Sequence, residues 1–204
     1  KEQIQQIAAQ TRSSFETGSF APTGVQCLFD DVHDAIDTAI RAQHQLMDMS
    51  LEERGKLIEA MRVCAREHAE ELAILAHEET GYGKVPHKIA KNLLAANKTP
   101  GIEDLHPTAF SGDNGLTLVE TAPYGVIGAI TPSTNPTIIN NSISMISAGN
   151  AVVYNPHPAA KRASQKAMEL LNEAIVKAGG PNGLMTAAKE PTLDTSKVIM
   201  THKA

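Results

Sequence analysis

Residues 130–136 follow a short apolar run, and several of their side chains can bind a ligand or an anion. The apolar run at 126–130 is typical of a strand buried on both faces of a parallel sheet. The segment itself consists of Ile130, Thr131, Pro132, Ser133, Thr134, Asn135 and Pro136. Ligands of open α/β sheets bind at the carboxyl ends of such strands. A well-capped loop without a ligand explains four crowded polar residues less well, so we favour a binding loop.

A second candidate segment follows the next predicted strand, at 151–154. It consists of Asn155, Pro156, His157 and Pro158. Both segments should project from the same edge of the sheet, because parallel strands end together. His157 could contact the adenine or ribose of a nucleotide, or it could be an exposed loop histidine. Neither strand is followed by G-x-G-x-x-G, so a standard Rossmann phosphate loop is not expected.

The two cysteines are poor candidates for a nucleophile. Cys27 lies beside a segment rich in Ser, Thr and Gly, and Cys64 lies within a predicted amphipathic helix, where a free thiol usually acts as a small apolar group. The eight histidines include no HExxH motif. We therefore predict two reduced thiols, no catalytic role for either, and no metal site.

The composition argues against several classes of partner. Of the 204 residues, 42% are hydrophobic and 20% are charged, which predicts a globular chain with a substantial core. The net charge of −5 does not suit binding to nucleic acid or to an anionic membrane surface. No apolar run approaches the roughly 20 residues that span a bilayer, and the first residues do not resemble a secretory signal. We expect a cytoplasmic protein.

The elements around the two candidate segments alternate between helix and strand. Helices are predicted at 30–47, 50–80, 88–97, 138–148 and 159–178, and a further strand is predicted at 197–200. Ser50 and Glu53 have the spacing of a capping box, Gly81 suits a helix end, and Thr134 or Asn135 can cap the helix that follows. The alternation predicts βαβ units in a doubly wound parallel sheet.

Residues 1–14 predict a short amphipathic helix with Ile4, Ile7, Ala8 and Thr11 on one face. The residues that follow are rich in Ser, Thr and Gly, which is typical of a linker. A helix tethered in this way either meets a partner or packs on its own domain, and both alternatives remain open.

Several motifs along the chain agree with one protein family. Residues 122–136 are APYGVIGAITPSTNP, and residues 141–161 are NSISMISAGNAVVYNPHPAAK. Shorter motifs are ETGYGK at 79–84, KNLLAA at 91–96 and GDNGLT at 112–117. Together they resemble the aldehyde dehydrogenase superfamily, and within it the CoA-acylating propionaldehyde and acetaldehyde dehydrogenases of propanediol and ethanolamine utilisation. The resemblance covers nearly the whole chain.

The resemblance implies an aldehyde dehydrogenase-like α/β fold in which this chain is the N-terminal half. The expected parts are a possible targeting helix at 1–14, a linker at 15–29, a helical part of the cofactor domain at 30–107, an oligomerisation hairpin at 108–121, and the first part of the nicotinamide-cofactor domain at 122–204. The catalytic domain would lie in another part of the polypeptide. A homo-oligomer and, through the targeting helix, microcompartment shell proteins are the implied partners.

The resemblance also implies a reaction. A cysteine thiolate beyond residue 204 attacks a short-chain aldehyde, hydride passes to NAD, and CoA captures the thioester to give acyl-CoA. The amide of Asn135 or the hydroxyl of Thr134 is expected to hold the oxyanion, and the remaining residues of the two candidate segments are expected to bind the cofactor.

The chain departs from the family pattern in three places. Hydrolytic relatives have Pro-Trp-Asn-Phe-Pro where this chain has Pro-Ser-Thr-Asn-Pro, so counting places Thr134 at the position of their oxyanion-binding Asn. Asn155 and Pro158 stand where those relatives have the Lys and Glu that bind the adenosine ribose, which leaves NAD or NADP open. The segment 136–140 is a couple of residues shorter than the family pattern.

Two other functions remain as alternatives. The chain could be a non-catalytic module that binds a cofactor or docks into a microcompartment shell. It could also belong to a reductase of the same superfamily that acts on an acyl phosphate. A requirement for CoA in turnover would distinguish the predicted enzyme from both.

Overall fold

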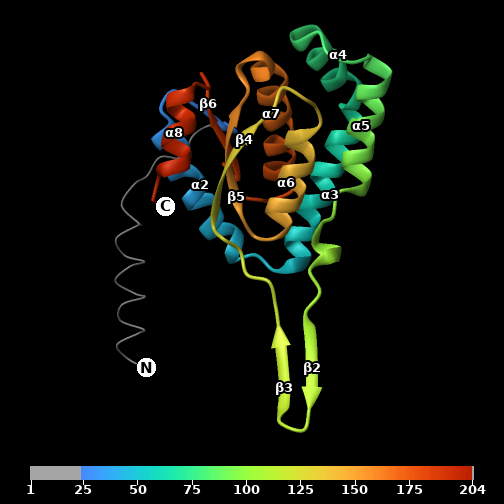
Figure 1. Ribbon diagram of the computed structural model, residues 1–204, viewed down its shortest axis with the longest axis vertical. Coiled ribbons are helices and arrows are strands. Elements are labelled where there is room, and N and C mark those ends of the chain that lie inside the picture. The colour runs from blue at the N-terminus through green and yellow to red at the C-terminus, as the bar shows by residue number, and fades with distance from the viewer. Residues whose placement is uncertain (1–23, 204) are drawn as a thin grey trace.

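The computed structural model describes residues 24–203, and a four-stranded parallel sheet forms its centre (Figure 1). The strands lie in the order β1-β6-β5-β4 and are β1 (Leu28–Phe29), β6 (Met185–Ala188), β5 (Ala151–Pro156) and β4 (Val126–Thr131). All neighbouring strands are parallel. The carboxyl ends of β4 and β5 therefore meet at one edge, where Thr131 pairs with Pro156. The predicted helix at 1–14 and most of the predicted linker lie outside the described residues.

Helices cover both faces of the sheet, as Figure 1 shows. On one face, α2 (Val32–Met47) packs on β5 and β6 and contacts α8 (Leu193–Thr201). On the other face lie α6 (Thr137–Ser147) and α7 (Lys161–Lys177), with α3 (Leu51–Glu67) packed against both. The predicted doubly wound sheet is confirmed. No helix within residues 24–203 is both long and apolar enough to cross a bilayer.

Local sequence signals set several of the helix ends. The Asp31 carboxylate accepts a hydrogen bond from the backbone N–H of His33 at 2.8 Å and starts α2. Ser50 and Glu53 form the predicted capping box at the start of α3. Gly81 ends α4 (Ala69–Thr80) in the left-handed region at φ 69°, which glycine adopts without steric cost.

The single helix predicted over 50–80 is instead two helices, α3 and α4, which are separated at His68. The buried stripe continues across this break, since Ala65, Ala69 and Leu72 are all buried. Apolar periodicity alone could not reveal the break, because the stripe keeps its helical spacing through it.

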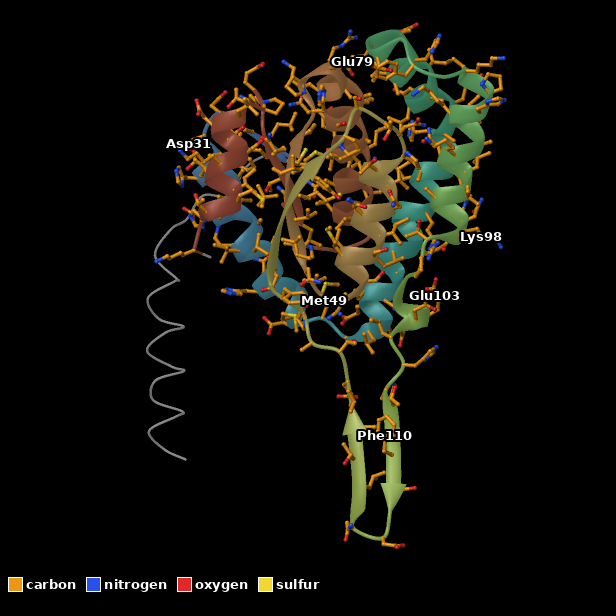
Figure 2. All side chains as sticks on the ribbon, viewed as in Figure 1. Asp31, Met49, Glu79, Lys98, Glu103 and Phe110 are labelled. Atoms are coloured by element: carbon orange, nitrogen blue, oxygen red, sulfur yellow. The ribbon has the colours of Figure 1, made fainter. Side chains whose placement is uncertain are left out.

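A hairpin projects from the body on the side away from the carboxyl ends of the strands (Figure 1). It follows α5 (Val85–Lys98) and the short 3-10 helix η1 (Ile102–Asp104), and it consists of β2 (Thr108–Gly112) and β3 (Gly115–Val119), paired antiparallel. All ten strand residues are exposed, among them Phe110, Leu116 and Leu118. Figure 2 shows Phe110 on the hairpin, away from the body. A hairpin was predicted at 108–121, and the paired strands span residues 108–119.

The predicted strand at 197–200 is wrong, because these residues belong to α8. A capping box between Thr192 and Thr195 starts this helix, and Ile199 packs against β4. A Cβ atom at Gly128 of β4 would lie 2.5 Å from Cγ2 of Ile199, so glycine there allows the close approach of α8. The run Val198-Ile199-Met200 is too short to separate helix from strand by periodicity.

Two strands were missed by the sequence analysis. β6 is MTAA, whose alanines do not indicate a strand, and β1 is a two-residue strand within the segment predicted as a linker. Both owe their conformation to tertiary pairing, since Leu28 pairs with Ala187 and Phe29 with Ala188.

Candidate functional site

The two candidate segments lie side by side at the carboxyl ends of the neighbouring strands β4 and β5. β4 and β5 pair along their whole length, and the backbone N–H of His157 donates to the carbonyl oxygen of Thr131 at 3.0 Å. Beneath the first segment is a cavity of about 30 Å³, lined by residues 133–139 and by side chains of α4, α5 and α7. This volume suits a single water molecule.

Asn135 points into the protein and forms three hydrogen bonds with α5. Its Oδ1 accepts from Nζ of Lys88 at 3.2 Å, and its Nδ2 donates to the carbonyl oxygen of Lys88 at 3.1 Å and to Oδ1 of Asn92 at 2.8 Å. An ammonium group can only donate and a backbone carbonyl can only accept, so these partners fix which way the carboxamide faces. Both N–H groups of Asn135 are thus used inside the protein.

The prediction that Thr134 or Asn135 would cap the next helix is wrong. No side chain caps α6, whose first residue follows Pro136, and the hydroxyl of Thr137 donates to the carbonyl oxygen of Thr134 at 3.0 Å. The Asn135 amide cannot cap α6 because α5 already binds it. The hydroxyl of Thr134 is not held by α5 in this way.

The residues at the start of the first segment differ in exposure. Ile130 is 49% exposed on β4, the last strand of the sheet, whereas Thr131 is buried. Among the described residues, Oγ1 of Thr131 has no hydrogen-bond partner. A buried hydroxyl without a partner is costly, so this atom suits a ligand or a water molecule that supplies the missing bond.

Asn155 holds α8 against the end of β5. Its Nδ2 donates to the carbonyl oxygen of Thr192 at 3.1 Å and to Oγ of Ser196 at 2.6 Å, and its Oδ1 accepts from Oγ1 of Thr195 at 2.7 Å. Asn155 is buried, and its amide is used by these contacts. It therefore positions the helix beside the site.

His157 is the exposed polar residue of the second segment. Its Nδ1 accepts a hydrogen bond from the backbone N–H of Ala159 at 3.1 Å, which orients the ring at the start of the 3-10 helix η2 (Pro158–Ala160). Nε2 is then the ring nitrogen that can meet a ligand. Pro156 ends β5 and Pro158 begins η2, so the two prolines fix the backbone on either side of His157.

Glu79 is a residue of the site region whose role the sequence analysis missed. Its two carboxylate oxygens accept hydrogen bonds from the backbone N–H groups of Arg162 and Ala163, each at 2.8 Å. These N–H groups begin α7, and a helix start of this kind is a common site for phosphate. Here a carboxylate from α4 occupies that position.

Neither cysteine is suited to nucleophilic attack. Burial, and to a lesser extent the charge of Glu169, raises the pKa of the Cys27 thiol to about 12. Burial and nearby acidic groups, Glu67 first, raise the pKa of Cys64 to about 11. The thiolate is the reactive form, and both thiols remain protonated near neutral pH.

Comparison with known proteins shows strong similarity over almost the whole chain. Residues 12–204 match the model of the aldehyde dehydrogenase family. An acetaldehyde dehydrogenase (acetylating) of Bilophila wadsworthia is 45% identical over 98% of this chain. A propanal dehydrogenase (CoA-propanoylating) of Salmonella typhimurium is 43% identical over 86% of it.

Solved structures give the same result. A propionaldehyde dehydrogenase from the fucose utilisation microcompartment of Clostridium phytofermentans is 54% identical, with a TM-score of 0.84 over 87% of this chain. A propionaldehyde dehydrogenase of Rhodopseudomonas palustris, with bound CoA and an acylated cysteine, is 44% identical, with a TM-score of 0.83 over 86% of this chain.

This chain is shorter than the proteins that it matches. It spans 42% of the Bilophila wadsworthia protein and 42% of the Clostridium phytofermentans structure. The family match nevertheless covers far more than half of this chain, and the fold matches at high identity. The chain belongs to the aldehyde dehydrogenase family.

Proposed function

We propose that this chain forms the cofactor-binding half of a CoA-acylating aldehyde dehydrogenase. The whole enzyme would convert a short-chain aldehyde, CoA and NAD to acyl-CoA, NADH and a proton, through a cysteine thioester. The observation that carries this proposal is identity of 43–45% to relatives named as acetylating and CoA-propanoylating dehydrogenases. The cysteine would come from a part of the polypeptide beyond residue 204, since Cys27 and Cys64 are held protonated.

In this proposal a dinucleotide binds at the carboxyl ends of β4 and β5. The residues proposed to line the site are Ile130, Thr131, Pro132, Ser133, Asn155, Pro156, His157 and Pro158, of which Asn155 contributes by positioning α8 and not through its own amide. The free ring nitrogen of His157 supplies a hydrogen-bonding group, and exposed Ile130 supplies an apolar surface. These residues would hold NAD, which would supply the hydride acceptor for the former aldehyde carbon after thiolate attack.

Two residues of the first segment have separate tasks in this proposal. The Thr134 hydroxyl would donate a hydrogen bond to the oxygen of the aldehyde as that oxygen becomes negative, which lowers the barrier to thiolate attack. Asn135 does not reach the substrate, because both of its N–H groups bind α5. It holds the loop in place instead.

Turnover by the whole polypeptide tests the proposal. With propanal, NAD and CoA, we expect NADH to accumulate together with propanoyl-CoA, and we expect omission of CoA to stop sustained turnover. Phosphate in place of CoA, with an acyl phosphate as product, would instead support the alternative reductase. Binding of NAD with no turnover under either condition would support a non-catalytic module.

We further propose that the hairpin formed by β2 and β3 mediates homo-oligomerisation. Its exposed apolar side chains include Phe110, Leu116 and Leu118, and a hairpin with no other element packed on it rarely remains stable alone. Replacement of Leu118 by Asp should reduce the mass seen by light scattering, whereas Asp113→Asn at the exposed turn should not. Unchanged mass for Leu118→Asp would contradict this proposal.

Residues 1–14 are proposed to direct the cytoplasmic protein into a bacterial microcompartment. The proposal rests on their amphipathic pattern and on the microcompartment origin of a related structure. A fluorescent protein fused to residues 1–23 should co-localise with shell proteins. Ile4→Glu and Ile7→Glu together should abolish this, whereas Gln5→Glu should not. Diffuse fluorescence of the unaltered fusion would contradict the proposal.

A further inference from the structure

Lys88 is a buried lysine beside the candidate oxyanion loop. It lies on α5 and is 5% exposed. Within the described residues, no carboxylate lies within ion-pair distance of its ammonium group, although seven other Lys and Arg side chains there have such a partner. Burial, and then the charge of Lys91, lowers the pKa of Lys88. A buried ammonium without a counter-charge is costly, which points to a role beyond packing.

The side-chain partner of Lys88 is Asn135. The ammonium donates to Oδ1 of Asn135 at 3.2 Å, while the carbonyl oxygen of Lys88 accepts from Nδ2 of the same side chain at 3.1 Å. One residue therefore binds both ends of one carboxamide. Since the ammonium cannot accept and the carbonyl cannot donate, the reversed orientation of the amide would lose both bonds.

The contacts continue into the body of the protein. Asn135 also donates to Oδ1 of Asn92, and Nδ2 of Asn92 donates to the carbonyl oxygen of Ala69 at 2.9 Å. Asn92 is 1% exposed. The loop between β4 and α6 is thus connected through α5 to the start of α4. Lys88 is the charged member of this network, and hydrogen bonds from charged donors are the stronger ones.

We propose that Lys88 is a positioning residue for the loop that contains Thr134. By fixing the carboxamide of Asn135, it holds the adjacent Thr134 where the aldehyde oxygen becomes negative. This inference rests on the proposed function, and it assigns Lys88 no contact with the substrate. Loss of the ammonium removes the donor to Oδ1 of Asn135 and loosens the loop, while the contacts of Asn155 and His157 at the second segment remain.

The test compares Lys88→Met with Lys91→Met in the whole polypeptide. Lys91 is an exposed lysine on the same helix, so its replacement is a matched control. Misplacement of a catalytic group by about 1 Å can lower a rate about 100-fold. We expect Lys88→Met to lower kcat at least 10-fold with the KM for NAD changed less than twofold, and Lys88→Arg to recover most of the loss. A kcat within twofold of the parent for Lys88→Met would overturn the proposal.

A second measurement does not depend on turnover. In Lys88→Met, amide hydrogen exchange of residues 133–140 should accelerate at least 10-fold, with exchange of residues 192–201 unchanged. Lys91→Met should change neither. Equal exchange of the loop in all variants would overturn the proposal, even if the whole polypeptide lacks CoA-dependent turnover. Absence of that turnover in the parent would refute the proposed function alone.

A variant of Asn135, the partner of Lys88, shows whether a lower kcat in Lys88→Met comes from loss of this contact or from a general loss of folding. Asn135→Ala removes the same contact without removing the lysine. If Lys88 acts through Asn135, Asn135→Ala should lower kcat by a similar factor, and the double variant should lose little more than either single variant. Multiplication of the two losses in the double variant would show that Lys88 acts by another route.

Discussion

The Glu79 carboxylate lies at the start of α7 and accepts a hydrogen bond from the backbone N–H of Arg162 at 2.8 Å. Its second oxygen accepts from the next N–H, that of Ala163, also at 2.8 Å. Figure 2 shows Glu79 at the end of the molecule opposite the hairpin. The carboxylate thus accepts hydrogen bonds from two N–H groups that have no partner within α7. Its negative charge also interacts favourably with the positive end of the helix dipole. It connects α4 to α7.

Replacement of Glu79, which is half-buried, should therefore destabilise the chain. We expect Glu79→Ala to lower the free energy of unfolding by about 1–2 kcal/mol, in the range measured for the loss of a helix N-cap. Glu79→Gln should cost less, because one amide oxygen can still accept. Urea unfolding would measure the differences, with Glu78→Ala as the exposed neighbouring control. Equal effects at positions 78 and 79 would contradict the capping role.

Tyr154 and Ser142 form a buried polar contact between β5 and α6. The two hydroxyl oxygens lie 2.7 Å apart, and each residue is 0% exposed. Loss of one partner leaves the other hydroxyl buried without a partner, which costs about 1–3 kcal/mol. We expect Tyr154→Phe and Ser142→Ala each to destabilise by that amount and the double variant by less than their sum. Strict additivity in a double-mutant cycle would contradict a direct interaction.

The parts of the fold that the sequence predicted are those with strong local signals. Ser50 and Glu53 marked a helix start, Gly81 marked a helix end, and the apolar run at 126–130 marked a buried strand. These signals depend on residues close together in the chain, so periodicity and capping rules detect them. The family resemblance then supplied the arrangement of these elements.

The parts that the sequence did not predict depend on contacts between distant segments. β1 forms only because it pairs with β6, more than 150 residues later in the chain. The short apolar run at 198–200 became helical because Thr192 and Thr195 start a helix that packs on Gly128. The site showed the same limit: Lys88, Asn92 and Glu79 gave no local sign of their partners, although each contacts residues more than 20 positions away.

Asn155 provides a further test, since its amide binds three residues at the start of α8. Asn155→Ala should accelerate amide exchange of residues 192–201 and lower the free energy of unfolding by about 1–3 kcal/mol, because it removes the three hydrogen bonds of Asn155 with Thr192, Thr195 and Ser196. His157→Ala is the matched control, because His157 is exposed and does not contact α8 through its ring. It should leave the exchange of residues 192–201 unchanged and raise the KM for NAD in the whole enzyme. Unchanged exchange of α8 in Asn155→Ala would contradict the positioning role.

The buried thiol of Cys27 should make the chain less stable at high pH. An unperturbed cysteine ionises near pH 9, whereas burial raises the pKa of Cys27 to about 12. Below pH 9 the thiol is protonated in both states and contributes no pH dependence. Above pH 9 the unfolded chain releases this proton and the folded chain keeps it, so the free energy of unfolding should fall by about 1.4 kcal/mol per pH unit from this residue until about pH 12. Cys27→Ala should therefore show a shallower fall between pH 9 and pH 11 than the parent. Identical slopes for the parent and Cys27→Ala, measured by urea unfolding, would mean that Cys27 ionises in the folded chain as readily as in the unfolded one.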